Sequence, residues 1–197
     1  MIRQGLVDIQ QTDPTILVEL KYSTTDNFVG KDVYGDLTRA YLQPMAAQKL
    51  AKASQELQKR QPNLRLLVYD ATRPRSAQWD LWKTLSHLPV SERGKYVSNP
   101  RNGSVHNFGC AVDLTLATKD GKPLDMGTKF DYFGELAYPE KEDHLLKQGK
   151  LTCKQVENRR LLRSVMQKAG FSSLKTEWWH FNALSRAEAR QQYKIVE

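Results

Sequence analysis

Three short stretches, far apart in the chain, hold side chains that can bind a metal ion and transfer protons. They are residues 70–74 (Asp-Ala-Thr-Arg-Pro), 104–113 (beginning Ser-Val-His and ending at an Asp) and 177–180 (Glu-Trp-Trp-His). A histidine beside an apolar strand, or an aspartate after a valine, is usually structural when it occurs alone. A chemistry that uses all three stretches requires a fold that brings distant parts of the chain to one place.

The length and composition predict a single domain over residues 1–197. A chain of 197 residues is long enough for one well-buried core and short for two. Its hydrophobic content of 40% and charged content of 26% are typical of a globular domain. No internal repeat or low-complexity linker divides it.

Hydrophobic periodicity predicts both strands and helices along the chain. The expected strands cover residues 15–22, 64–69, 110–116 and 177–182. The expected helices cover residues 44–60, 76–86, 153–169 and 185–193, with Pro44 in the first turn of the first, Ser76 as N-cap of the second and Gly170 at the end of the third. Because no strict βαβ rhythm links them, we expect an α+β fold with a central, mostly antiparallel sheet flanked by helices.

His106, Asp113 and His180 form a candidate metal site on a face of that sheet. Gly109 permits the chain to turn after His106, and alternation in the strand at 110–116 places Asp113 on its polar side. Two imidazoles and one carboxylate are a typical ligand set for catalytic zinc, which keeps a fourth position for water. The sequence therefore predicts one Zn²⁺ per chain, whereas His87 and His144 lack such neighbours and are expected on the surface.

Glu177 is the candidate general base. It lies three residues before His180, and on an ideal strand the two side chains would point to opposite faces. Trp178 and Trp179 favour a strand over a helix, so we expect a bulge or a strand end that brings Glu177 over the metal. The alternative is an ordinary exposed carboxylate on a strand.

Arg73 is the candidate group for stabilising negative charge on a carbonyl oxygen. It follows a buried strand and precedes Pro74, so its backbone is restrained. A permanent cation in a stiff loop suits an oxyanion, although a surface salt bridge to Asp70 would explain it equally well.

Other function classes find little support in the sequence. The formal charge of +8 is spread among acidic residues, and no nucleic-acid-binding motif accompanies it. No apolar run is long enough to span a membrane, and no Gly-x-Ser-x-Gly motif indicates a serine nucleophile. Cys110 is expected in the core, and only coordinates can judge a bridge to Cys153. The N-terminus shows no signal peptide, so a cytoplasmic protein is expected unless a signal has been removed, in which case the cell envelope is.

The chain resembles the D-alanyl-D-alanine dipeptidases, zinc enzymes within a wider group that contains lysostaphin-type peptidases, D,D-carboxypeptidases and the hedgehog signalling domain. The wider group shares the His-x6-Asp and Glu-Trp-Trp-His elements. The stretches at 26–30 (Asp-Asn-Phe-Val-Gly) and 126–131 (Met-Gly-Thr-Lys-Phe-Asp) resemble the dipeptidases more narrowly.

The resemblance implies roles for individual residues. The three metal-binding candidates match the zinc ligands, Glu177 the base and Arg73 the group that polarises the scissile carbonyl. Asp131 matches a carboxylate that receives the free amino group of the substrate, and Ser104 and Tyr22 match pocket residues. The implied activity is hydrolysis of D-alanyl-D-alanine in peptidoglycan precursor turnover or recycling. The alternatives are a D,D- or L,D-carboxypeptidase acting on muropeptides and a non-catalytic zinc module.

Overall fold

The computed structural model describes residues 1–94 and 96–197, and a mixed sheet lies at its centre. The strand order is β2-β4-β5-β7-β6, and a separate pair joins β1 to β3. Within the larger sheet β2 and β4 run parallel, whereas every other neighbouring pair is antiparallel. The strands are β1 (Val7–Asp8), β2 (Leu17–Val18), β3 (Tyr41–Leu42), β4 (Leu64–Asp70), β5 (Ala111–Thr118), β6 (Ser172–Ser173) and β7 (His180–Asn182).

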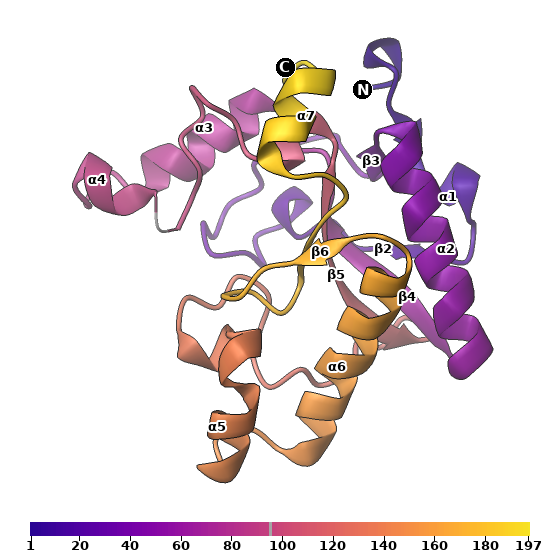
Figure 1. The fold of residues 1–197 in the computed structure, drawn as a ribbon. Helices are drawn as coiled ribbons and strands as arrows, with labels where there is room; N and C mark the ends of the chain where they lie inside the picture. Colours follow the sequence, from indigo (N-terminus) through magenta and orange to yellow (C-terminus); the bar gives the residue numbers. More distant parts are fainter. Residues whose placement is uncertain (95) are drawn as a thin grey trace.

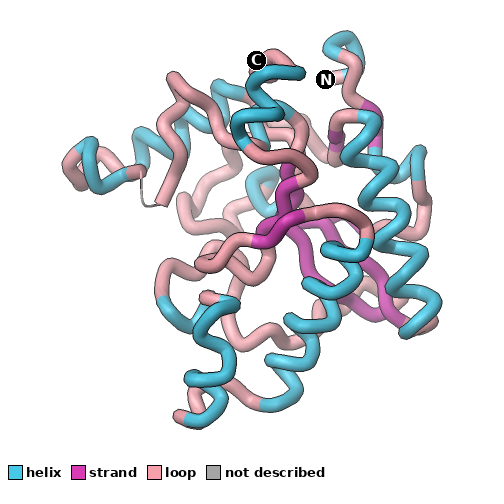
Figure 2. The backbone as a smooth tube through the Cα atoms, in the orientation of Figure 1, coloured by secondary structure: helices cyan, strands magenta, loops and turns pink. Residues whose placement is uncertain are grey.

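Helices surround this sheet, which confirms the α+β prediction. Figure 2 shows the strands at the centre of the molecule with helices on several sides. The α-helices are α1 (Ile9–Thr12), α2 (Pro44–Arg60), α3 (Arg75–Thr84), α4 (Val90–Arg93), α5 (Glu142–Lys147), α6 (Cys153–Lys168) and α7 (Arg186–Gln192). Short 3₁₀ helices cover Ile2–Gln4, Lys21–Ser23, His106–Phe108, Glu135–Ala137 and Pro139–Lys141.

The two long helices cover one face of the sheet. In Figure 1, α2 and α6 lie together on the right of the molecule, and α2 packs on β4 while α6 packs on β5. Alternation along β5 places its apolar side chains toward these helices and leaves Asp113 and Thr115 on the opposite face. The core between helices and sheet includes Leu50, Leu57, Leu66, Val68, Val112, Leu114, Leu116, Leu162 and Val165.

Helix ends follow the local chemistry in two cases and differ from expectation in a third. Pro44 opens α2, and Thr152 caps α6 through a reciprocal capping box with Gln155, an arrangement worth about 1 kcal/mol. The prediction that Ser76 caps α3 is wrong. The helix begins one residue earlier, at Arg75, and Pro74 holds the N-cap position without a side-chain bond.

Two predicted strands are shorter than their sequence pattern suggests. The strand expected at 15–22 is reduced to β2, because after Glu19 the chain turns into a 3₁₀ helix that buries Tyr22 among aromatic rings. The strand expected at 177–182 begins only at His180. In both cases an aromatic side chain that favours a strand in isolation is buried by packing outside the sheet.

The cysteines are both free thiols. Cys110 is fully buried beside Phe108 and Ala189, as expected, and burial raises the pKa of its thiol to about 12. Cys153 is exposed at the start of α6. Among the described residues, no helix has both the length and the apolar character needed to cross a membrane.

Gly109 joins the His106–Phe108 turn to β5 and allows a test of that connection. Its φ is +70°, and an added Cβ would lie 2.6 Å from Leu6 Cδ2 and 3.0 Å from Thr72 Oγ1. We expect Gly109→Ala to lower the free energy of unfolding by about 2–4 kcal/mol in urea denaturation, through both strain and overpacking. Gly121→Ala, at φ +87° with open space around it, should cost only about 1–2 kcal/mol. Equal losses would contradict close packing at Gly109.

Candidate metal centre

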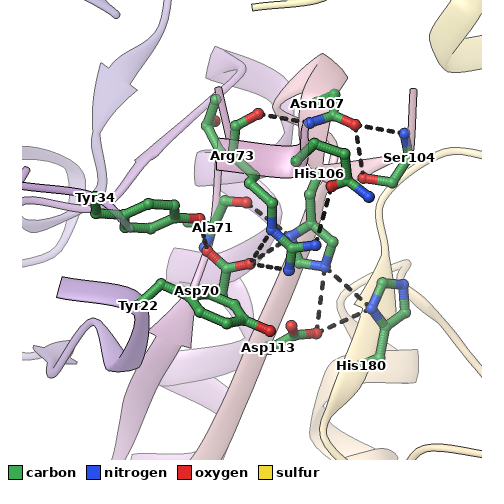
Figure 3. Close-up of polar contacts among 12 residues, drawn as sticks. Tyr22, Tyr34, Asp70, Ala71, Arg73, Ser104, His106, Asn107, Asp113 and His180 are labelled. Carbon is green, nitrogen blue, oxygen red and sulfur yellow. Dashed lines mark hydrogen bonds and ion pairs between the residues drawn. The ribbon is translucent and has the colours of Figure 1, made fainter. Parts of the chain in front are cut away.

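Strand pairing brings two of the three metal-binding candidates together. Asp113 on β5 and His180 at the start of β7 are direct partners in the antiparallel register. His106 reaches the same point from the other direction, because the turn that it opens ends in Gly109 and leads straight into β5. Figure 3 shows the three side chains converging. All three residues are buried.

The converging atoms have the spacing of metal ligands. His106 Nε2 lies 3.1 Å from His180 Nδ1 and 3.3 Å from Asp113 Oδ1, and His180 Nδ1 lies 2.9 Å from Asp113 Oδ1. Ligands about 2.0–2.1 Å from a tetrahedral zinc ion are separated by about 3.3 Å. The triangle of donor atoms therefore fits one small divalent cation. Among the described residues, His106, Asp113 and His180 form a group that could hold a metal ion.

The outer hydrogen bonds of both imidazoles also fit a metal. His106 Nδ1 donates to the carbonyl of Ala71 at 2.7 Å, and His180 Nε2 donates to Asn182 Oδ1 at 2.9 Å. A neutral imidazole has one donor nitrogen, so these bonds leave a lone pair on each inward-facing nitrogen. On neutral rings, two lone pairs and a carboxylate oxygen at this spacing would repel one another, and either a cation between them or a proton on one ring removes the repulsion.

Electrostatics at the cluster favour positive charge. Burial opposes ionisation of Asp113, but His106 and His180 together hold its pKa below the ordinary value. Burial likewise opposes protonation of His180, yet the carboxylates of Asp113 and Glu177 raise its pKa to about 9. A divalent cation would satisfy the same demand for positive charge.

Arg73 lies beside this cluster in a fixed position. Its Nε and Nη2 both donate to Asp70 Oδ2, at 3.1 and 2.5 Å, and Nη1 donates to Gln78 Oε1 at 3.1 Å. Its guanidinium lies over the ring of Tyr22, with the carbon 4.9 Å from the centroid. Asp70 also accepts a short hydrogen bond from Tyr34. The salt bridge to Asp70 exists, but it is buried and it orients Arg73 toward the cluster rather than toward solvent.

Glu177 approaches the cluster from the segment before β7. Trp178 and Trp179 form a bend, so the irregularity expected here takes the form of a strand end. Glu177 Oε2 lies 3.9 Å from His180 Nδ1, and its side chain is half-buried. Burial raises the pKa of Glu177, and the charge of Asp113 adds to this effect, while His180 and His106 oppose it. A carboxylate with a raised pKa is suited to accept and return a proton near neutral pH.

Asp131 and Tyr22 form a pair at one side of the cluster. The Tyr22 hydroxyl donates to Asp131 Oδ2 at 2.7 Å, and Asp131 adopts φ 57° in a turn. Burial raises the pKa of Asp131 well above its ordinary value, and the charges of Asp113 and Glu177 raise it further, despite the bond from Tyr22. No described basic side chain forms a salt bridge with Asp131, and the charge of Arg73 in the same cavity only partly offsets the rise in its pKa, so the site holds a carboxyl group without an ion-pair partner.

Ser104 lies at another side of the cluster. Its hydroxyl and its backbone N–H both donate to Asn107 Oδ1, at 3.0 and 2.6 Å, and Asn107 Nδ2 donates to the carbonyl of Arg73 at 2.7 Å. These bonds tie the segment before the metal-binding turn to the loop after β4 (Figure 3). Asn107 is therefore a structural link between two parts of the site.

All eight site residues predicted from the sequence line one cavity of about 600 Å³. They are Tyr22, Arg73, Ser104, His106, Asp113, Asp131, Glu177 and His180. His87 and His144, expected on the surface, are exposed.

Besides Asn107, three residues that were not predicted from the sequence hold the site in place. Asn182 orients His180, Gln78 orients Arg73, and Tyr34 binds the far side of Asp70. Asn182 is two residues after His180 on the same strand, so strand alternation could have placed it on the same face. No comparable signal exists for Tyr34, which is 36 residues from Asp70.

Comparison with known proteins agrees with this geometry. A family model described as D-Ala-D-Ala dipeptidase matches residues 3–196. The chain belongs to the D-Ala-D-Ala dipeptidase family. This is a family of metallopeptidases, which accords with the cluster of potential metal ligands.

Relatives from several bacteria cover most of the chain. The D-alanyl-D-alanine dipeptidase of Escherichia coli (strain K12) is 36% identical over 89% of this chain and 83% of its own length. That of Enterococcus faecium is 35% identical over 83% of each chain. That of Enterococcus faecalis (strain ATCC 700802 / V583) is 30% identical over 84% of this chain and 85% of its own length.

Metal content tests the cluster directly. Purified protein dialysed against zinc should retain about one metal ion per chain, and His106→Ala should lose it, because two remaining ligands bind a cation weakly. The matched control is His144→Ala, which removes an exposed imidazole. Elemental analysis that finds full metal occupancy in His106→Ala would remove His106 from the site.

Proposed function

We propose that this protein hydrolyses D-alanyl-D-alanine to two D-alanines, with one Zn²⁺ held by His106, Asp113 and His180. The observation that supports this most is one cavity in which a metal-binding triad, a half-buried carboxylate, a fixed guanidinium and a carboxylate without a countercharge all meet. Each is a group that cleavage of a small peptide with a free amine requires. The relatives bear the same activity in their names.

Zinc in a site of this type supplies Lewis acidity, which makes water nucleophilic near neutral pH. The outer bonds from His106 to Ala71 and from His180 to Asn182 fix the ring orientations that this role needs. Because both bonds are donated from the outward nitrogens, neither ring can rotate without losing a hydrogen bond.

Glu177 moves the proton in this proposal. Its carboxylate accepts a proton from the attacking water and delivers it to the nitrogen of the departing D-alanine. The raised pKa matches the task, since the group must hold the proton between the two transfers. Glu177 lies before the start of β7, so its side chain is not bound to the alternation of the strand and can lie on the same side as His180.

Arg73 stabilises the charge that forms on the carbonyl oxygen when water adds. Its guanidinium is already ordered by Asp70 and Gln78, so little reorganisation is needed during the reaction. The Asp70 carboxylate reduces its net charge, but the hydrogen bonds to Asp70 and Gln78 leave one N–H on each of Nη1 and Nη2 for the oxyanion.

Asp131 binds the free amino group of the substrate. A ligand ammonium provides the countercharge that the protein itself does not, and it would lower the raised pKa of this carboxyl. Tyr22 holds the carboxylate in place through its hydroxyl. A substrate with a blocked amine would leave the half-buried Asp131 without a partner, which explains selection for a free N-terminus.

If Glu177 is the base, its substitution should lower turnover without affecting metal binding. Glu177→Gln should keep its zinc and lower kcat by about 10²–10⁴-fold, because the amide cannot accept the proton. Glu157→Gln, on the exposed side of α6, is the control and should retain full activity. Near-normal turnover by zinc-loaded Glu177→Gln would reject the proposed base.

The role of Asp131 predicts a preference for free amines. The wild-type protein should cleave D-alanyl-D-alanine with a kcat/KM at least about 100-fold above that for its N-acetyl derivative, and Asp131→Asn should reduce this ratio. A higher kcat/KM for a capped pentapeptide than for the dipeptide would indicate a D,D-carboxypeptidase instead. Zinc-loaded protein that cleaves no D,D- or L,D-peptide would indicate a non-catalytic module.

A further inference from the structure

The free carboxylate of a dipeptide needs a countercharge as much as its amine does. Among the described residues that line the cavity, the permanently charged basic side chains are Arg73 and Arg186. The first of these is already committed. Asp70 and Gln78 hold its guanidinium, and the donors that remain on it are assigned to the oxyanion at the scissile carbonyl.

Arg186, in contrast, has no acidic partner among the described residues. It is the first residue of α7, its side chain is exposed, and its one polar contact among the described residues is a hydrogen bond from Nη2 to the carbonyl of Gly103 at 2.5 Å. A carbonyl positions a guanidinium but does not neutralise it. Four of the five N–H donors of an arginine remain for a ligand, in the forked geometry that suits a carboxylate.

The position of Arg186 matches the far end of a dipeptide. Gly103 directly precedes Ser104, whereas the amine-binding Asp131 belongs to the segment before α5. In Figure 1, α7 lies above the region of β6, and the segment that leads into α5 lies below it. The metal-binding cluster lies in the cavity that both segments line. A dipeptide whose amine meets Asp131 and whose peptide bond meets the cluster therefore directs its carboxylate toward α7.

Ser104 cannot replace Arg186 in this role. Both its hydroxyl and its backbone N–H already donate to Asn107 Oδ1. A hydroxyl carries one proton, so a carboxylate beside Ser104 would meet oxygen lone pairs rather than a donor. The nearby cation on α7 is then the group that can balance the negative charge.

We propose that Arg186 binds the C-terminal carboxylate of the dipeptide and is a specificity-determining residue of this site. The proposal rests on the proposed dipeptidase function. It explains how the site requires a free carboxylate at one end of the substrate as well as a free amine at the other. It also assigns α7 a role in substrate selection that no motif in the sequence indicates.

The test compares D-alanyl-D-alanine with D-alanyl-D-alaninamide, which lacks the negative charge, on zinc-loaded protein. Wild type should prefer the acid. Arg186→Gln should raise KM for the acid roughly tenfold, with kcat and the KM for the amide nearly unchanged, because only the acid loses a charged partner. Arg186→Lys should restore part of the loss.

The control is Arg190→Gln, which removes a second exposed arginine one turn along α7, away from the cavity. This variant should leave the ratio of kcat/KM for the acid to kcat/KM for the amide at the wild-type value. An unchanged ratio in Arg186→Gln, or an equal fall for both substrates, would overturn the proposal and leave Arg186 as a support for the Gly103 loop. If wild type cleaves D-alanyl-D-alanine while Arg186→Gln keeps its ratio, the dipeptidase function stands without this inference. If wild type cleaves neither substrate, both fall.

Discussion

The site depends on the antiparallel pairing of Asp113 with His180 across β5 and β7. This register places a carboxylate and an imidazole side by side on one face of the sheet, 67 residues apart in sequence. A shift of one residue in either strand would turn one of the two side chains to the opposite face and destroy the ligand set. The turn closed by Gly109 then has only to deliver His106 to a point that the sheet has already defined.

Around this pairing, buried charges are balanced in layers. Asp113 lies between two imidazoles. Arg73 donates hydrogen bonds to Asp70 and Gln78, and Asp70 also accepts a hydrogen bond from the Tyr34 hydroxyl. Removal of one member of a buried pair costs about 3–5 kcal/mol, so each layer orders the next. The unbalanced groups are Asp131, with its raised pKa, and Arg186, without an anionic partner among the described residues. These two are the ones that the account gives to the charged ends of the substrate.

Much of this arrangement could be predicted from the sequence, and the misses have physical causes. Helix α2 and strands β4 and β5 were predicted nearly to the residue, because their hydrophobic periodicity is strong and matches the faces that they bury. The strands expected at 15–22 and 177–182 were too long, because burial of Tyr22 and of Trp178 outside the sheet overrides their preference for strands. The residues of the site carry chemistry that motifs reveal. Their supports, such as Tyr34 and Gln78, act through long-range packing that no local pattern records.

The central claim is that two imidazoles and one carboxylate hold a single zinc ion. X-ray absorption at the zinc edge, on protein loaded with one equivalent of zinc, tests it most directly. We expect nitrogen and oxygen ligands at about 2.0–2.1 Å with the multiple-scattering signal of two imidazoles. A sulfur shell at about 2.3 Å, which would place the metal on Cys110 or Cys153, or a spectrum without imidazole scattering, would contradict it.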